Sequence, residues 1–433
     1  MTGNGSDRFD VVVVGGGPAG LAAAASAAEC GVRVALVDDQ VDFGGQVWRA
    51  QANDQQAPAV DWIRTLELAG VQLFRGTRVF DWGSGNVLRA EQGDQLCEIG
   101  YHKLILATGA RERFLPFPGW TLPNVMGAGG LQALVKSGLV IKDKRVVIAG
   151  TGPLLLAVAA YVRQRGANLL LICEQAARAA LARFTFGLLG HPKKIGQSLA
   201  LLKATRGVRF VTESAIIAAH GTRVLEQVEI SVAGKNEIIA CDYLAAGFHL
   251  VPNTELPALV GCQLENGYVA VDEYQQTSKA GTYCAGEPTG IGGLELALME
   301  GQIAGFAAAG HHRLAKKFFS RRNQLRRFAS AMNRAFALRE ELRNHTLAET
   351  IVCRCEDVTY SQLQKHRSWR AAKLDTRCGM GPCQGRICGP ATQFLLNWSL
   401  DAPRPPVWPA AVEHLGTSID GPQPEYSRIV RSA

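Results

Sequence analysis

The chain has 433 residues, enough for two or three domains that each bury a core of their own. Its formal net charge is +8, and its 47% of hydrophobic residues is ordinary for a globular protein. No stretch approaches the ~18–20 apolar residues of a membrane span, and the N-terminus lacks the pattern of a signal peptide. We therefore expect a cytoplasmic protein, at most peripherally associated with the inner membrane.

The first predicted unit is "FDVVVVGGGPAGLAAAASAAECGVRVALVDDQ", a β-branched strand, a glycine loop, an alanine-rich helix and a second strand. Gly15 allows the tight turn, Gly17 lets the backbone approach a pyrophosphate, and Gly20 lets the helix pack closely on the strand. The helix N-terminus points its amides at the phosphates. Asp38 follows Gly20 at the distance expected for a ribose ligand. The pattern predicts a dinucleotide site; the alternative is a glycine turn without a ligand.

Three later motifs, "VDFGGQVWR", "KLILATGARER" and "GTYCAGEPTG", follow predicted strands. With them, residues 8–310 resemble the flavoprotein oxidoreductases related to thioredoxin reductase and glutathione reductase. The resemblance implies an α/β fold of two Rossmann-like domains, the second inserted in the first, with FAD in the first. The implied FAD-binding positions in these motifs are Gly45, Gln46, Thr108, Gly109, Gly286 and Glu287. Glu287 stands where the family has aspartate, so this contact departs from the family pattern.

The second glycine loop, "KDKRVVIAGTGPLLLAVAAYVRQRGANLLLICEQ", repeats strand, loop, helix and strand. In the resembled family this inserted domain holds NAD(P)H. Here Leu155 occupies the third glycine position, and Glu174 would disfavour the 2′-phosphate of NADP. We expect a scaffold, or a site for a different adenine nucleotide, that receives no hydride from a nicotinamide.

Residues 1–310 contain no closely spaced cysteine pair, so thioredoxin-reductase chemistry is excluded. No catalytic motif accompanies the glycine loops, and we predict no catalytic residue on this chain. His249 is a lone histidine beside a turn, and we interpret it as structural.

A basic run from His312 to Arg343 carries apolar residues at helical spacing. We predict a helix that packs on the body and exposes a cationic face. Nucleic-acid binding is the less favoured alternative, because no helix-turn-helix or stacking motif accompanies the run.

Five of the eleven cysteines crowd between residues 353 and 388. Cys353 and Cys355 form C-x-C, Cys383 and Cys388 form C-x4-C, and Cys378 precedes the second pair. Zinc, a 2Fe–2S cluster and reduced thiols are all open. The tight C-x-C argues against zinc, whereas nearby glycine amides and arginines suit an anionic cluster.

Residues 350–397, with "CRCE" and "GMGPCQGRIC", resemble the bacterioferritin-associated ferredoxin domain. The resemblance implies a 2Fe–2S cluster on Cys353, Cys355, Cys383 and Cys388, and leaves Cys378 without a role or as a substitute ligand. The tail is rich in proline, and we expect a disordered end or an extended arm on a partner or on the FAD domain. The predicted domains are 1–112 and 245–311 (FAD domain), 113–244 (inserted domain), 312–347 (basic linker helix), 348–400 (2Fe–2S domain) and 401–433 (arm).

This order of domains is similar to the alpha-type subunit of heteromeric FAD-dependent amine and imino-acid dehydrogenases, the family of opine oxidase, D-hydroxyproline dehydrogenase and hydrogen cyanide synthase. The resemblance implies a beta-type partner of the D-amino-acid-oxidase class, a small ferredoxin-like gamma subunit in some complexes, and electron transfer toward a quinone or other acceptor. Two alternatives stay open. One is a self-sufficient NAD(P)H-dependent FAD reductase of an iron–sulfur partner, and the other is a non-catalytic assembly subunit.

Overall fold

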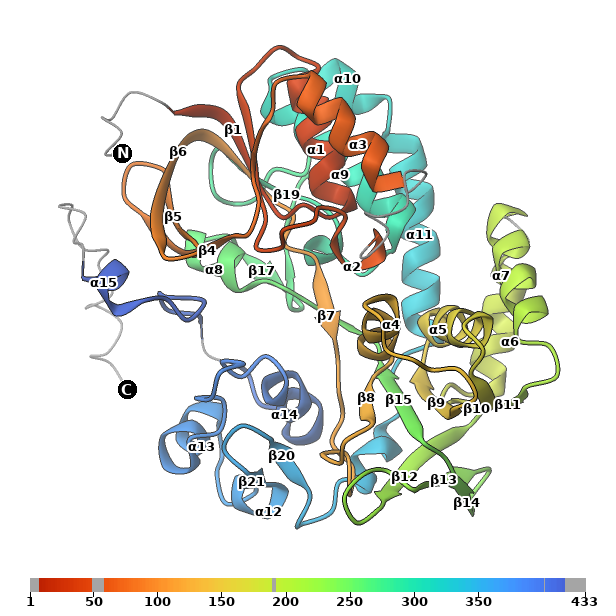
Figure 1. Cartoon of the computed structure of the whole chain (residues 1–433). Coiled ribbons are helices and arrows are strands. Elements are labelled where there is room, and N and C mark those ends of the chain that lie inside the picture. Colours follow the sequence, from red (N-terminus) through yellow and green to blue (C-terminus); the bar gives the residue numbers. More distant parts are fainter. Residues whose placement is uncertain (1–7, 49–57, 189–191, 401, 417–433) are drawn as a thin grey trace.

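Two large domains, each built on a parallel sheet with helices packed on it, and a small, mainly helical domain make up the described part of the protein (Figure 1). The computed structural model describes residues 8–48, 58–188, 192–400 and 402–416. Both large domains have a parallel sheet with a glycine loop after its central strand, and the second domain interrupts the first in the sequence. The predicted fold class is therefore confirmed.

The first domain is built on a parallel sheet that continues into an antiparallel one. The parallel strands, in spatial order, are β3 (Gln72–Phe74), β2 (Val34–Val37), β1 (Phe9–Val14), β6 (Gln95–Leu106) and β19 (Thr282–Cys284). Strand β6 also pairs with β5 (Val87–Gln92), which pairs with β4 (Thr77–Gly83). The apolar run Val11–Val14 of β1 suits its place in the middle of a sheet covered on both faces.

Helices α1 (Pro18–Ala28) and α9 (Leu294–Ala308) pack on this sheet with their backbones in close contact. A Cβ atom on Gly301 would lie 2.2 Å from the Ala19 carbonyl oxygen, so glycine is required there. Helix α3 (Pro58–Leu68) flanks α1, and the short α2 (Gly45–Trp48) follows β2. The close packing brings the start of α1 beside the chain that leaves β19.

The second domain has its own parallel sheet. Its strands, in spatial order, are β11 (Arg209–Val211), β10 (Asn168–Glu174), β9 (Arg145–Thr151), β15 (Tyr243–Phe248) and β8 (Val125–Gly127). Its helices are α4 (Ala128–Lys136), α5 (Pro153–Gln164), α6 (Arg178–Gly187) and α7 (Pro192–Ala204). An antiparallel sheet of β12 (Ser214–His220), β13 (Gln227–Val232) and β14 (Lys235–Ala240) completes it. Strand β15 pairs with β9 through Phe248, four residues beyond the predicted boundary at residue 244.

The chain crosses between the two domains twice, along an antiparallel pair of short strands, β7 (Ala110–Glu112) and β16 (Leu250–Pro252) (Figure 1). After the second crossing come α8 (Glu255–Val260), β17 (Leu264–Glu265), β18 (Tyr268–Val269) and the 3-10 helix η2 (Glu287–Thr289). The motif residues predicted near the flavin therefore lie close to this crossing.

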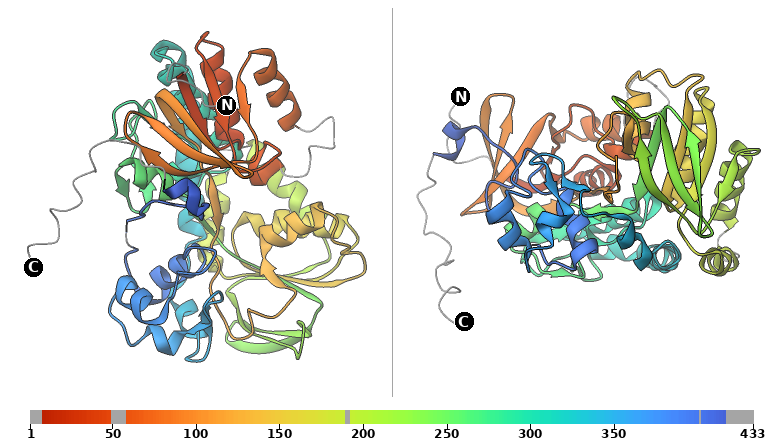
Figure 2. Two further views of the ribbon diagram at one scale, coloured as in Figure 1. Left: turned by 60° about the vertical axis from the view of Figure 1, so that its left-hand side comes forward. Right: turned by 90° about the horizontal axis from the view of Figure 1, so that it is seen from below.

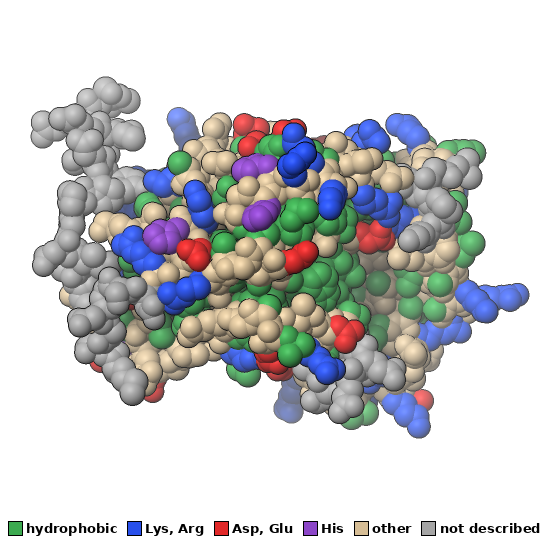
Figure 3. All heavy atoms as spheres, turned by 90° about the horizontal axis from the view of Figure 1, so that it is seen from above, with side chains coloured by type: hydrophobic (Ala, Val, Ile, Leu, Met, Phe, Trp, Pro, Cys, Tyr) green, Lys and Arg blue, Asp and Glu red, His purple; other side chains and the backbone are tan. Residues whose placement is uncertain are grey.

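The basic run forms two helices, α10 (His312–Lys316) and α11 (Phe319–Ala335), followed by the 3-10 helix η3 (Glu340–His345). The predicted single linker helix is thus divided, and Phe318, between α10 and α11, stacks on Phe306 with ring centroids 5.9 Å apart. Leu325 is buried, as the apolar spacing predicts. On the face seen from above, basic side chains are scattered among acidic and apolar ones (Figure 3).

The cysteine domain lies below the first domain and beside the second (Figure 2). Its elements are β20 (Ile351–Cys353), β21 (Val358–Thr359), α12 (Tyr360–Leu363), α13 (Trp369–Thr376) and α14 (Cys388–Leu396). It is tied to the crossing region where the Trp120 indole donates to the Ile351 carbonyl at 2.6 Å.

The described part of the arm, residues 402–416, lies on the first domain and includes α15 (Val412–Leu415). The Val407 amide donates to the Phe80 carbonyl at 2.8 Å, and His414 contacts Glu91 at 2.7 Å. The remaining residues of the predicted arm lie outside the described part. Among the described residues, no helix combines the length and apolar character needed to cross a membrane.

Candidate functional site

The first glycine loop is tight at two positions and open at a third. A Cβ atom on Gly15 would lie 2.2 Å from the Ala107 carbonyl oxygen, and one on Gly20 would lie 1.7 Å from the Gly15 carbonyl oxygen. At Gly17 the nearest atom to such a Cβ is the Gly45 Cα, at 3.9 Å. The loop therefore packs closely on its strand and leaves space above Gly17, which is where a pyrophosphate would approach the amides of α1.

Asp38 closes this loop from the end of β2. Its carboxylate accepts hydrogen bonds from the Gly16 amide and, at 2.7 Å, from the Gln40 amide. Burial raises the pKa of Asp38 to about 6. The structure thus brings Asp38, Gly17 and Gly45 to one place, while Gln46 is exposed on α2.

The Thr108–Gly109 turn is fixed by the second crossing strand. The Thr108 hydroxyl donates to the Asn253 carbonyl at 2.6 Å, and the Asn253 side-chain amide donates back to the Thr108 carbonyl at 2.9 Å. Asn253 also donates its backbone amide to the Gly109 carbonyl at 2.9 Å. These bonds make the end of β6 a rigid platform.

Glu287 turns toward the start of α9. Its carboxylate accepts from the amides of Gly292 and Gly293 at 3.1 and 2.9 Å, and burial raises its pKa to about 7. The carboxylate thus orders the loop before α9. Gly286 needs its positive φ of 81° and lies against Ala19 of α1.

Glu300 is a site residue that no sequence motif predicts. It is buried in α9, accepts from the Gly286 amide at 3.0 Å and from the Thr289 hydroxyl at 2.8 Å, and pairs with Arg326 of α11 at 2.7 Å. The available signal was an acid in the middle of a mostly small and apolar helix, whose other acid, Glu295, lies in its first turn. Through this pair, the basic run holds the Gly286–Glu287 motif in place.

In the second glycine loop the acid is fully engaged by its own loop. Glu174 accepts from the Gly152 amide, the Thr151 hydroxyl and the Ala176 amide, each at 2.8 Å. Burial raises the pKa of Glu174. Leu155 is 1% exposed and fills the core between α5 and the sheet.

The segment after α11 lies over this second loop. The Thr151 hydroxyl contacts the Phe336 carbonyl at 3.2 Å, and the Gln175 side chain donates to the Ala337 carbonyl at 3.0 Å. The Arg339 amide donates back to Gln175 at 3.1 Å. The chain thus covers the edge at which Glu174 would meet a ribose, which disfavours a dinucleotide there.

The five cysteines of the C-terminal domain converge. The sulfur atoms of Cys353, Cys378 and Cys388 all lie within 4.8 Å of one another, and these residues are buried. The sulfur atoms of Cys355 and Cys383 are 3.9 Å apart, and Cys383 also contacts Cys388. The four predicted ligands are therefore brought together as two linked pairs, with Cys378 beside the inner one.

Hydrogen bonds between the thiols give the cysteines different pKa values. Bonds from Cys378 and Cys388 lower the pKa of Cys353 to about 2, whereas the pKa of Cys378 is raised to about 12 by its bond to Cys353. The amides of Gly379 and Gly385 also lower the pKa values of Cys353 and Cys383, respectively. The loop thus offers sulfur ligands together with donors that stabilise negative charge on sulfur.

Two glycines of the cysteine loop meet demands of packing as well. A Cβ atom on Gly379 would lie 2.5 Å from the Trp369 ring, and one on Gly381 would lie 2.2 Å from the Cys355 Cβ. Trp369 packs on the loop because Gly379 carries no side chain, and Cys355 packs there because Gly381 carries none. The donor set, its amides and its apolar cover fit a metal centre held by thiolates.

Arg111 links the flavin-side turn to the cysteine loop. Its guanidinium donates to the Asn253 side-chain oxygen at 2.7 Å and to the Arg386 carbonyl at 3.1 Å, and pairs with Glu255 at 2.9 Å. The Arg386 amide donates to the Cys383 carbonyl at 3.0 Å. A continuous set of hydrogen bonds thus connects Thr108 with Cys383.

His249 has the backbone conformation of a turn, with a φ of 73°, and its ring contacts the Asn333 side chain at 3.2 Å. Burial lowers its pKa. These contacts agree with the structural interpretation of this residue.

Comparison with protein families matches residues 9–304 to "Pyridine nucleotide-disulphide oxidoreductase". The chain belongs to the pyridine nucleotide-disulphide oxidoreductase family. It is 31% identical to hydrogen cyanide synthase subunit HcnB of Pseudomonas protegens over 421 residues, covering 87% of this chain and 89% of that protein. It is 30% identical to an opine oxidase subunit of Agrobacterium tumefaciens, covering 88% and 84%, respectively.

Solved structures support the same fold for this pyridine nucleotide-disulphide oxidoreductase. L-proline dehydrogenase from P. horikoshii superposes with a TM-score of 0.67 at 19% identity, covering 95% of this chain and 80% of that one. Thioredoxin reductase of T. acidophilum superposes with a TM-score of 0.56 at 21% identity, covering 70% of this chain and 99% of that one.

Proposed function

We propose that this chain is the electron-transferring flavoprotein and iron–sulfur subunit of a heteromeric dehydrogenase that oxidises an amino acid, imino acid or opine. The observation that carries the proposal is the convergence of five cysteine thiols in a domain joined by hydrogen bonds to the flavin-side turn of an oxidoreductase fold. Its relatives carry names of subunits of hydrogen cyanide synthase and opine oxidase. We infer a beta-type partner of the D-amino-acid-oxidase class, with a small ferredoxin-like gamma subunit in some complexes.

FAD would be held by Gly15, Gly17, Gly20, Asp38, Gly45, Gln46, Thr108, Gly109, Gly286 and Glu287. Membership of the family and the open space at Gly17 support this assignment. The 2Fe–2S ligands would be Cys353, Cys355, Cys383 and Cys388. When bound, the flavin supplies two-electron transfer and the cluster supplies one-electron transfer.

The chain's own residues set the conditions for that transfer. The amides of α1 and of Gly379 and Gly385 are oriented toward negative charge. Arg111 holds the Thr108 turn and the cysteine loop in fixed relation, and Trp369 shields the loop from water. Cys378, as a neutral thiol, donates to the Cys353 sulfur. Together they make a rigid and partly dry connection between the two predicted centres.

The proposal is tested by co-expressing the chain with a partner of the beta type and measuring dye reduction with amino acids, imino acids and opines as donors. Donor-dependent reduction is expected only when both proteins are present. Rapid bleaching of the isolated chain by NADH, saturating at low concentration, would instead support a self-sufficient reductase. A chain that lacks flavin and iron after gentle anaerobic purification would support an assembly role.

A further inference from the structure

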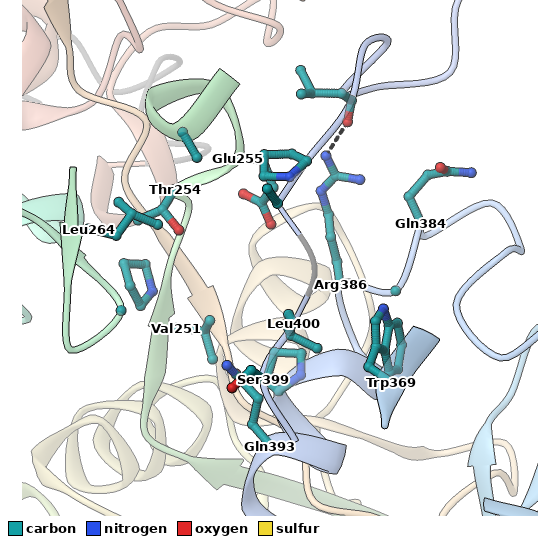
Figure 4. Close-up of a pocket in the computed structure, with 18 of the residues that line it drawn as sticks. Val251, Thr254, Glu255, Leu264, Trp369, Gln384, Arg386, Gln393, Ser399 and Leu400 are labelled. Atoms are coloured by element: carbon teal, nitrogen blue, oxygen red, sulfur yellow. Dashed lines mark hydrogen bonds between the residues drawn. The ribbon is translucent and has the colours of Figure 1, made fainter. Parts of the chain in front are cut away.

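A large cavity lies between the second crossing strand and the cysteine domain. Its volume is about 1570 Å³. Figure 4 shows Val251, Thr254 and Glu255 on one side and Trp369, Gln384 and Arg386 on the other. This volume exceeds the roughly 300–1,000 Å³ of ordinary small-molecule pockets, so a small ligand would occupy one part of it.

The cavity is strongly positive. Among the described residues that line it, seven side chains are basic and one, Glu255, is acidic. Glu255 is already paired with Arg111 at 2.9 Å. A concave surface of one sign raises the local concentration of ions of the opposite sign, so the cavity favours anions.

Arg113 is one of the uncompensated cations in this set. It is partly buried, its Nε atom is enclosed without a hydrogen-bond partner, and within the described part of the chain no carboxylate forms an ion pair with it. Burial lowers its pKa. Removing a guanidinium from water without a counter-ion costs free energy, and an anion bound in the cavity would offset that cost.

Tyr268, on β18, lines the same cavity. Burial raises the pKa of its hydroxyl, which therefore stays protonated and able to donate at neutral pH. The charge of Arg113 and that of Glu287 both act on this hydroxyl. Strand β18 contacts the 3-10 helix η2, which begins at Glu287, so Tyr268 lies near the Gly286–Glu287 motif predicted to contact the flavin.

We propose that Arg113 and Tyr268 form a binding site for a small carboxylate anion, in the corner of the cavity nearest the predicted flavin site. A guanidinium donates two parallel hydrogen bonds to a carboxylate, and the phenol hydroxyl supplies a third. Arg111, which is held by Asn253 and Glu255, adds positive charge to the cavity wall. The proposed function assigns no ligand to this cavity, and the new site depends on it only where the flavin serves as a reporter.

The test is a titration of the purified chain with succinate at constant ionic strength, with chloride as the comparison anion. Binding is followed by calorimetry and by the flavin difference spectrum. Saturable binding of succinate is expected. Arg113→Met should weaken it about tenfold or more, and Tyr268→Phe by a smaller factor, in line with the loss of charge-assisted and neutral hydrogen bonds.

Arg343→Met is the matched control. Arg343 lines the same cavity, carries the same charge and, like Arg113, has an enclosed Nε atom without a hydrogen-bond partner. Unlike Arg113, it is paired with Glu340 at 2.9 Å and donates to Asn397 at 3.0 Å. Its removal should weaken binding by less than about threefold, the range of a screened charge near a site.

Three results would overturn the site. These are calorimetry without saturable succinate binding, equal weakening by Arg113→Met and Arg343→Met, and loss of bound FAD in Arg113→Met, which would assign Arg113 to the flavin. Calorimetry reports on the carboxylate even in a chain that holds no flavin. Failure of the site and failure of the proposed function are therefore distinguishable.

Discussion

The two glycine loops follow the same plan but have different surroundings. In each, an acid at the end of the next strand accepts from a loop amide, Asp38 from Gly16 and Glu174 from Gly152. Both loops leave open space at the glycine that precedes the helix, Gly17 in the first and Gly152 in the second. The second loop differs in having Leu155 in its core and a hydrogen bond from the Thr151 hydroxyl to the Phe336 carbonyl. The two loops thus share a backbone plan and differ in one core side chain and one covering segment.

The largest effect is expected when the first loop receives the side chain of the second. In Gly20→Leu the new Cβ would meet the Gly15 carbonyl oxygen at 1.7 Å, a clash between backbone segments that no rotamer relieves. We expect loss of bound FAD and a destabilisation above about 4 kcal/mol, measured as the ratio of flavin to protein and by denaturant unfolding. Gly31→Leu is a control for added bulk, because its Cβ would meet open space, although its φ of 79° also carries strain. A Gly20→Leu protein with full flavin content would show that FAD binding does not require the close packing of Gly20 on Gly15.

The two acids should separate binding from stability. Glu174→Ala leaves the buried Gly152 and Ala176 amides without their acceptor and should cost about 3 kcal/mol of unfolding free energy, with flavin content unchanged. Asp38→Ala lies at a partly exposed site where water can replace the carboxylate, so it should cost about 1 kcal/mol. The Asp38→Ala substitution should, however, weaken the binding of FAD about tenfold. Chemical denaturation and FAD titration of both variants check this contrast, and it fails if Glu174→Ala is the variant that loses flavin.

The pH dependence of stability distinguishes the first acid further. The pKa of Asp38 is raised by burial to about 6 in the folded protein, above the usual range of an aspartate. The folded state therefore binds more protons than the unfolded state between about pH 4 and pH 6, and the contribution of Asp38 to stability falls as the pH rises through this range. The free energy of unfolding of Asp38→Asn, relative to that of the wild-type apoprotein, should therefore rise by about 2 kcal/mol as the pH increases from about 4 to about 7.

The contribution of Asp242 to stability should have the opposite pH dependence. Its pKa is lowered by hydrogen bonding to Arg145, so its contribution is present above the unfolded-state pKa and is lost as the pH falls through the folded-state pKa. Asp242→Asn should therefore lose stability relative to wild type at neutral pH. If the stability difference between variant and wild type changed with pH in the same direction for both variants, the raised pKa assigned to Asp38 would be wrong.

A smaller effect is expected at Cys378. If Cys353, Cys355, Cys383 and Cys388 hold the cluster, Cys378→Ala removes one hydrogen bond to sulfur, worth about 1 kcal/mol. The cluster spectrum should then persist, with a reduction potential lower by on the order of 40 mV. Potentiometry with EPR detection measures the shift. Loss of the cluster in Cys378→Ala together with its retention in Cys355→Ala would make Cys378 the ligand instead.

Much of the fold could be predicted because its signals are local. The strand, glycine loop, helix and acid of each domain lie within about forty residues, and each glycine role follows from backbone sterics. The contacts between the candidate sites and distant segments are of another kind. Thr151 meets Phe336 across 185 positions of sequence, and Arg111 meets Arg386 across 275. No spacing rule predicts such pairs.

The cysteine domain could be predicted only in part. Its motif placed four thiols together, but the position of Cys378 within the buried group depends on how α13 and α14 pack around Trp369. The sequence likewise did not predict the division of the basic run after Lys316, because the aromatic contact of Phe318 with Phe306 depends on α9. Helical periodicity predicted the buried face of this run but not its end.

Anaerobic purification with quantification of flavin, iron and zinc, followed by EPR after dithionite reduction, decides whether one chain carries both a flavin and a 2Fe–2S cluster. We predict one FAD, two irons and no zinc per chain, with a rhombic signal near g = 2 from one reduced cluster. A chain with one zinc, or with no iron and five titratable thiols in the C-terminal domain, would contradict the claim.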